Sequence, residues 1–228
     1  MNRTSFIQNL KVLQATSLPG IVPISHSSDS ISIASLLNEN TVFIQILQRY
    51  THDQGTRAFL SSLYDLQMQY MYCLLTNNSF SMTALNRMHS DLLLKLTVYL
   101  STDKDFGEVS RTTFRYLKEA LHKLNFKESD YERIANLEGY FSKFSDIIHD
   151  KNGHQIQSIE FLSDQLNAES QFGHVDASTM KNFNEYYLAV IFPLLNINYS
   201  RLGTVDRAMI DDCAKDAQVK KIKCFLKF

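Results

Sequence analysis

Glycine and proline are scarce in this sequence of 228 residues, which contains 7 glycines and 3 prolines. Both numbers are about half or less of average usage. Because these two residues interrupt helices, their scarcity favours long helices joined by short turns. No segment combines apolar–polar alternation with β-branched enrichment, so the sequence predicts no strand. We expect an all-α fold: a single irregular bundle of about eight to ten helices with a short N-terminal helical arm.

The sequence also lacks a strong net charge, a cysteine framework and a long apolar run. Lys and Arg total 23 against 24 for Asp and Glu, whereas nucleic-acid binding usually needs a strongly basic face, so we expect no nucleic-acid partner. Cys73, Cys213 and Cys224 are too few for a disulfide framework and fit a reducing compartment. The longest apolar run, residues 186–195, is shorter than the roughly 20 residues of a membrane span. The N-terminus lacks the apolar core of a secretory signal. These absences predict a soluble, cytoplasmic protein.

Residues 1–29 are predicted to form an arm and a linker. A short amphipathic helix near the N-terminus carries Phe6, Leu10 and Leu13 on one stripe. The following residues, 17–30, contain two of the prolines and five serines, a composition typical of a linker. A helix of this length is not stable by itself, so we expect it to dock on another surface.

Residues 30–228 are predicted to form one helical domain. One helical segment is apolar on two stripes, a pattern typical of a central helix in a bundle. We also expect a break near Asn38 and Asn40 and a kink at Pro193. The predicted helical segments are residues 31–50, 56–76, 81–101, 108–125, 129–148, 155–167, 176–194 and 204–226.

The sequence IIHDKNGH at residues 147–154 contains a His-Asp pair that can ligate a divalent cation. It resembles the LLHDIGH-type motif of the HD-domain metal-dependent phosphohydrolases, and the resemblance implies His149 and Asp150 as metal ligands. The sequence departs from that motif by the Lys-Asn dipeptide that precedes Gly153. His122 is the candidate upstream ligand, but it lies about 150° from the apolar stripe of its predicted helix, so we expect it to face solvent.

A structural explanation of the same residues competes with the metal site. Asn152 and Gly153 follow an apolar stripe, and Asn-Gly commonly terminates helices through a left-handed residue. His52 and Asp53 also follow an apolar stripe and precede a glycine, which indicates a shared structural role for the two pairs. No glycine-rich phosphate loop or nucleophile elbow is present. We therefore favour helix termination and expect no catalytic residue, metal or cofactor.

The C-terminal segment, residues 219–228, is basic and amphipathic. Its lysines alternate with apolar residues that include Ile222, Phe225 and Leu226. Such a segment can lie on an anionic membrane surface or in the groove of an acidic partner. The competing explanation is that its apolar side packs on the chain's own core, while its lysines complement the helix dipole.

The leading functional hypothesis is a non-enzymatic helical protein-interaction module: an adaptor, a chaperone-like protein or an accessory subunit of a larger assembly. Tyr- and Met-rich helices support it, because both residue types are enriched at interfaces. The Asn-, Ser- and Lys-leaning composition favours a bacterial, secretion-related assembly. Two alternatives remain open: a divergent HD-like phosphohydrolase that uses His149 and Asp150, and a peripheral membrane protein attached through its C-terminal segment. The candidate interaction residues are Phe6, Leu10, Leu13, Ile222, Phe225 and Leu226.

Overall fold

The structure is a computed structural model that describes residues 2–21, 23–24, 27–148, 172 and 174–227. Within those ranges it contains helices and no strand, which confirms the all-α multi-helix bundle. The predicted helix over residues 155–167 lies outside the described residues. The α-helices are α1 (Arg3–Ser17), α2 (Ser28–Tyr50), α3 (Gln54–Leu75), α4 (Ser79–Ser101), α5 (Phe106–Arg111), α6 (Phe114–Leu121), α7 (Glu128–Ile148), α9 (His174–Tyr186), α10 (Phe192–Leu194), α11 (Thr204–Cys213) and α12 (Asp216–Phe225).

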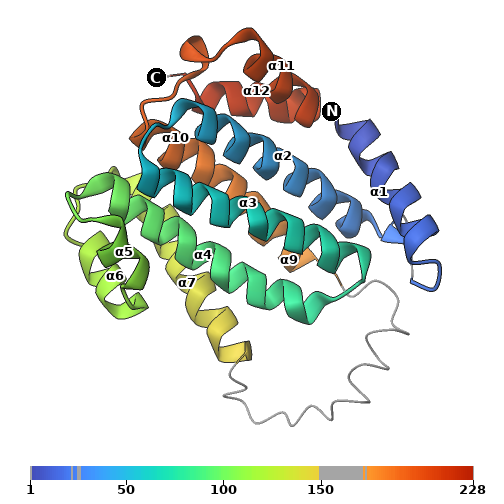
Figure 1. The fold of residues 1–228 in the computed structure, drawn as a ribbon, viewed down its shortest axis with the longest axis horizontal. Coiled ribbons are helices and arrows are strands. Elements are labelled where there is room, and N and C mark those ends of the chain that lie inside the picture. The colour runs from blue at the N-terminus through green and yellow to red at the C-terminus, as the bar shows by residue number, and fades with distance from the viewer. Residues whose placement is uncertain (1, 22, 25–26, 149–171, 173, 228) are drawn as a thin grey trace.

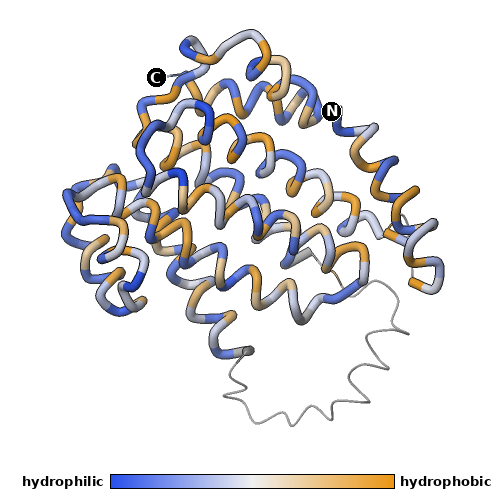
Figure 2. The backbone as a smooth tube through the Cα atoms, in the orientation of Figure 1, coloured by the Kyte–Doolittle hydropathy of each residue, from blue (hydrophilic) through white to orange (hydrophobic). Residues whose placement is uncertain are grey.

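The helices α2, α3 and α4 lie side by side in chain order (Figure 1). Helix α9 packs on α2, and helix α7 packs on α4. The short helices α5 and α6 lie against α4, whereas α1 and α11 both pack on α2. Figure 2 shows apolar and polar residues alternating along every helix, as expected of amphipathic helices that share one core.

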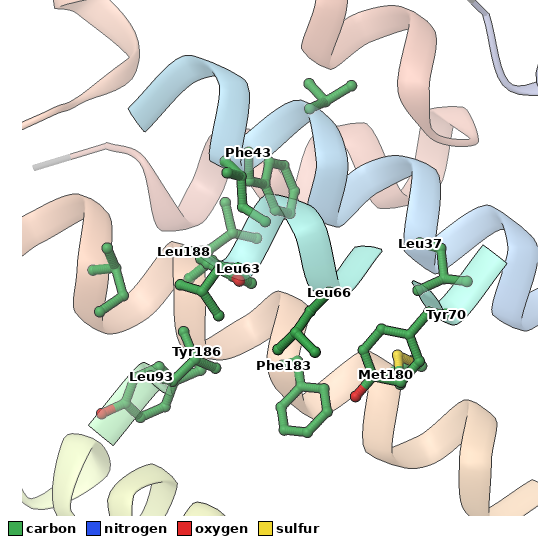
Figure 3. Packing of buried hydrophobic residues seen from close by; sticks show 14 of the residues in the cluster. Leu37, Phe43, Leu63, Leu66, Tyr70, Leu93, Met180, Phe183, Tyr186 and Leu188 are labelled. Atoms are coloured by element: carbon green, nitrogen blue, oxygen red, sulfur yellow. The ribbon is translucent and has the colours of Figure 1, made fainter. Parts of the chain in front are cut away.

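The hydrophobic core lies where α2, α3, α4 and α9 meet (Figure 3). Burying such side chains stabilises the fold by about 1.5–3 kcal/mol each before the loss of chain entropy is subtracted. The inner side of helix α3 is buried in the core, but Met68 of its second apolar stripe remains exposed, and so does the neighbouring Tyr72. The residues labelled in Figure 3 are Leu37, Phe43, Leu63, Leu66, Tyr70, Leu93, Met180, Phe183, Tyr186 and Leu188.

Short polar side chains begin the first five helices. In each case the residue before the helix accepts a hydrogen bond from the backbone N–H three residues later. Such a bond satisfies one of the N–H groups that a helix start leaves unpaired. The capping residues are Asn2, Ser27, Asp53, Asn78 and Asp105.

Helix α2 continues through Asn38 and Asn40, so the break predicted there is wrong. The side chains of Asn38 and Glu39 are buried and find partners in distant helices, whereas the buried amide of Asn40 has no hydrogen-bond partner among the described residues. The amide of Asn38 donates to the carbonyl of Cys213 at 3.3 Å, and Glu39 accepts from Asn184 at 2.7 Å. These tertiary hydrogen bonds compensate for burial, which the local sequence cannot indicate.

Three predicted segments are divided in the structure. Extended backbone at Thr112 and Thr113 separates α5 from α6, and extended backbone at Ala214 and Lys215 separates α11 from α12. The segment with the predicted kink at Pro193 changes earlier, into a π-helical turn at Tyr187–Ile191. A 3-10 turn at Tyr199–Arg201 then leads to α11. The helical positions were predicted correctly, but the breaks were not.

The N-terminal helix α1 docks on the body of the protein. Phe6 and Leu10 are buried against it, and so is the polar side chain of Gln14. The Gln14 amide donates to the carbonyl of Leu75 and accepts from the backbone N–H of Ile24, both at 2.9 Å. The segment predicted as an arm therefore lies on the bundle. The linker that follows it is bound to the side chain of Gln14 through the backbone N–H of Ile24.

Candidate functional site

The residues proposed as metal ligands, His149 and Asp150, lie outside the described residues. Their candidate partner His122 is 60 % exposed, and its Nε2 lies 3.2 Å from Glu138 Oε1. Its exposure agrees with the expectation that it faces solvent. In the described part of the chain, no group of three or more His, Cys, Asp or Glu side chains is arranged to hold a metal ion.

The second His-Asp pair has a structural role at the start of α3. Asp53 caps the helix by accepting from the backbone N–H of Thr56 at 2.7 Å and from the Thr56 hydroxyl at 2.8 Å. The backbone hydrogen bond is the main cause that lowers the pKa of Asp53 below its usual value. The pair at His52 and Asp53 therefore marks the beginning of a helix.

Four of the six candidate interaction residues are buried in the chain's own core: Phe6, Leu10, Ile222 and Leu226. Leu13 is 49 % exposed and Phe225 is half-buried. Two lysines of α12 are paired within the chain: Lys221 with Glu185 at 2.6 Å and Lys223 with Asp211 at 2.6 Å. The packing explanation thus describes the apolar side of α12, and a partner contact at Leu13 or Phe225 stays a prediction.

Several exposed apolar side chains lie beside cavities on α3 and α4. Cavities of about 550 and 700 Å³ adjoin along these helices and share Gln69 in their lining. We call the pair the α3–α4 groove. One half is lined by Met68, Gln69, Tyr72, Cys73, Ser81, Ala84 and Leu85. The other half is lined by Ser62, Asp65, Leu66, Gln69, Arg87, Met88, Asp91, Leu92, Lys95, Arg111, Thr112, Thr113, Phe114 and Phe141.

Small side chains line the apolar half of the groove, and large apolar side chains are exposed beside it. Cys73, Ser81 and Ala84 leave a hollow in its first half, and larger apolar side chains stand at its rim. Tyr72 is 65 % exposed, Met88 45 % and Met68 39 %. Exposed apolar side chains that gather beside a cavity are a feature of binding surfaces, whereas single ones are ordinary.

Aromatic and charged side chains close the other half of the groove. The rings of Phe114 and Phe141 stack with centroids 3.9 Å apart, and the guanidinium of Arg87 lies 4.6 Å from the Phe141 centroid. Lys95 pairs with Asp91 at 2.9 Å. The groove therefore has an apolar half near Tyr72 and a charged half near α6 and α7.

Comparisons with known proteins identify no relative. No family model, no curated protein and no solved structure matches this chain. Within the described residues, no helix combines the length and apolarity needed to cross a membrane.

A second cavity, of about 590 Å³, lies between α1, α2, α9 and α12. Arg3 and Lys215 line it, together with the carboxyl group of Glu39. Glu39 is only 4 % exposed, and burial raises its pKa from 4.5 to about 7, although hydrogen bonds from Asn184 and Gln218 oppose the shift. Glu39 was not predicted as a site residue. The only indication in the sequence is that an acidic residue stands within an otherwise apolar helix.

A buried histidine lies behind the groove, on the core side of α4. His89 Nε2 lies 2.9 Å from the Tyr187 hydroxyl, and its ring centroid lies 4.1 Å from that of Phe183. Burial lowers the pKa of His89 from 6.5 to about 3, so the imidazole is neutral. Beside it, Tyr70 donates to Asn86 Oδ1 at 2.9 Å. These polar groups tie α3, α4 and the π-helical turn together inside the core.

Proposed function

We propose that this chain is a non-enzymatic helical protein-interaction module that receives an amphipathic helix of a partner protein in the α3–α4 groove. The observation that carries the proposal is the exposed pair Met68 and Tyr72 beside a hollow lined by small side chains, with the exposed Met88 in the adjoining half of the groove. Methionine adapts its shape to a partner, and tyrosine buries a large ring while its hydroxyl stays hydrated. Both are enriched at protein interfaces.

The shape of the groove favours a helix as its occupant. Its lining runs from Ser62 to Cys73 along α3 and from Ser81 to Lys95 along α4. At a rise of 1.5 Å per residue, these stretches are roughly 17 and 21 Å long. A helix of three to four turns has this length and can place apolar residues at i, i+4 and i+7 on the floor.

The side chains of the charged half, near α6 and α7, favour one orientation of the partner helix in the groove. Asp65 lies on the α3 side of the groove and Arg111 on the α5 side, whereas Lys95 of α4 is paired with Asp91 of the same helix. A partner helix with its apolar anchors near Tyr72 therefore needs a basic residue opposite Asp65 and an acidic residue opposite Arg111. Such complementary charges select orientation and partner more than they add affinity.

The role of adaptor or accessory subunit in a larger cytoplasmic assembly is part of the same proposal. The bacterial, secretion-related setting rests on composition alone. The groove specifies the chemistry of the partner: an amphipathic helix with apolar residues at one end and paired charges at the other.

The test compares two tyrosines with nearly equal exposure. Tyr72→Glu places a charge at the groove, and Tyr116→Glu places the same charge on α6, where Tyr116 is 63 % exposed. Wild type and both variants are used for affinity capture from the source cells. The expected result is a stoichiometric partner that wild type and Tyr116→Glu retain and Tyr72→Glu loses by about tenfold or more.

The captured partner is then reduced to the peptide that binds. Circular dichroism should show that the peptide gains helix on binding, and a peptide with its acidic residue reversed to lysine should bind less well. Retention of the partner by Tyr72→Glu, equal loss in the two variants, or a peptide that binds in an extended form would each contradict the proposal.

A further inference from the structure

A separate cavity of about 530 Å³ lies where the start of α7, the π-helical turn and the end of α12 meet. We call it the π-turn cavity. Its volume is within the range of roughly 300–1,000 Å³ that is usual for small-molecule sites. It does not share a lining residue with the α3–α4 groove. The lining residues that the argument uses are Phe126, Lys127, Asp130, Arg133, Arg201 and Phe225.

The floor of the π-turn cavity is apolar and comes from three parts of the chain. Phe126 precedes α7, Leu194 belongs to α10, and Phe225 ends α12. Phe225 is half-buried because its neighbours Ile222 and Leu226 anchor α12 in the core. An apolar floor of this kind favours a ligand with a hydrocarbon chain or ring.

Cations dominate the rim of the same cavity. Lys127, Arg133 and Arg201 line it together with a single carboxylate, that of Asp130, so three positive charges face one negative charge. Arg133 donates through Nη1 to the carbonyl of Ser129 at 2.7 Å and to Asp130 at 3.3 Å. Both of these bonds leave from Nη1, so within the described residues Nε and Nη2 of Arg133 keep N–H donors that a ligand can use.

The π-helical turn lies in the stretch of chain that leads to Arg201. In that turn the N–H of Phe192 bonds to the carbonyl of Tyr187, five residues earlier, a widened geometry that occurs frequently at functional sites. The chain then reverses at Asn196, which has a positive φ of 55°, a conformation that asparagine tolerates well. Arg201 Nη1 donates to the carbonyl of Asn196 at 3.1 Å, which fixes this arginine at the cavity.

We propose that the π-turn cavity binds a small amphipathic organic anion. The apolar part of the ligand lies on the floor that Phe126, Leu194 and Phe225 provide. Its carboxylate pairs with the guanidinium groups at the rim, because arginine presents a planar fork of donors that matches a carboxylate. An inorganic anion leaves the floor uncovered, and an uncharged hydrocarbon leaves the cations unpaired, so neither satisfies the cavity as a whole.

The probe is decanoate, used below its micelle concentration, with decanol and acetate as partial ligands. The chain contains no tryptophan, so Phe225→Trp introduces a fluorescent reporter that is specific to this cavity. Its emission should shift to shorter wavelength and saturate with decanoate. Calorimetry on the wild-type protein should give one site. Decanol is expected to bind at least tenfold more weakly than decanoate, and acetate should give no saturable signal.

The matched variants remove one arginine each. Arg201→Gln at the rim should weaken decanoate binding by about tenfold, the usual cost of a lost charge-assisted hydrogen bond. Arg115→Gln, on α6 with a side chain that is 84 % exposed, should leave binding unchanged. Thermal unfolding verifies that both variants fold. Equal binding of decanol and decanoate, equal affinities of the two variants, or calorimetric saturation without a change in the emission of the Phe225→Trp variant would overturn the proposal.

Discussion

Replacing Glu39 by glutamine tests whether its carboxyl group, in the cavity between α1, α2, α9 and α12, is held in its neutral form. Glu39 is 4 % exposed, and it accepts a hydrogen bond from Asn184 Nδ2 at 2.7 Å. Gln218 also bonds to it, and the charge of Arg3 favours its ionised form. Glutamine has the same shape and can accept the bond from Asn184, but it does not titrate.

The size of the effect follows from the pKa values. Burial raises the pKa of Glu39 from 4.5 to about 7, so the folded protein binds a proton more tightly than the unfolded chain does. Its contribution to stability is complete below pH 4.5 and is lost as the pH rises toward 7. At about 1.4 kcal/mol per pH unit, the loss amounts to about 3 kcal/mol. Glu39→Gln should therefore match wild type near pH 4.5 and exceed its free energy of unfolding by about 3 kcal/mol at pH 8.

The assay is urea unfolding, followed by circular dichroism, at several pH values between 4.5 and 8. The difference between variant and wild type is the informative quantity, because other titrating groups such as His89 contribute equally to both. Glu132→Gln, on the exposed side of α7, is the control and should change the free energy of unfolding by less than about 0.5 kcal/mol at every pH. A Glu39→Gln difference that is the same at pH 4.5 and pH 8 would refute the reasoning.

Three further predictions concern the core and the turns. Burial lowers the pKa of His89 from 6.5 to about 3, so the wild-type protein loses stability as the pH falls from 6.5 toward 3. Between pH 7.5 and pH 4.5, the free energy of unfolding, measured with urea, should fall less for His89→Gln than for wild type. Gly55→Ala should cost about 1–3 kcal/mol, because a Cβ there overlaps the Tyr99 ring; Gly20→Ala, with nothing within 4 Å, should melt like wild type. Tyr186→Phe removes the 2.7 Å hydrogen bond with Thr97 and should cost about 1 kcal/mol in thermal unfolding.

Periodicity predicted the helices because an apolar stripe must face a core, and this requirement is local. Every described predicted segment is helical, and the helix over residues 56–76 is central as expected. The unbroken α2 could not be predicted, because the partners of Asn38 and Glu39 lie in α11 and α9. The low helix propensity of asparagine favours a break in the helix, but the tertiary hydrogen bond of Asn38 outweighs it.

The candidate surfaces were harder to predict than the fold. An apolar residue on an amphipathic stripe has the same sequence pattern whether it covers the chain's own core or a partner's. Phe6, Leu10, Ile222 and Leu226 are of the first kind. The α3–α4 groove depends on which side of α3 the neighbouring helices leave open, so no pattern within one helix could indicate it. The Tyr- and Met-rich composition of that helix was the only hint.

The hydrogen bonds of α2 also have a consequence for the order of folding. Asn38 finds its partner 175 residues later in the chain, and Glu39 finds its partner 145 residues later. During synthesis, α2 can form as a helix early, but burying it before α9 and α11 exist would leave these side chains without partners. Contacts this distant slow folding, because a long loop must close first. We therefore expect the nascent chain to keep the apolar side of α2 accessible to chaperones until α11 has emerged from the ribosome.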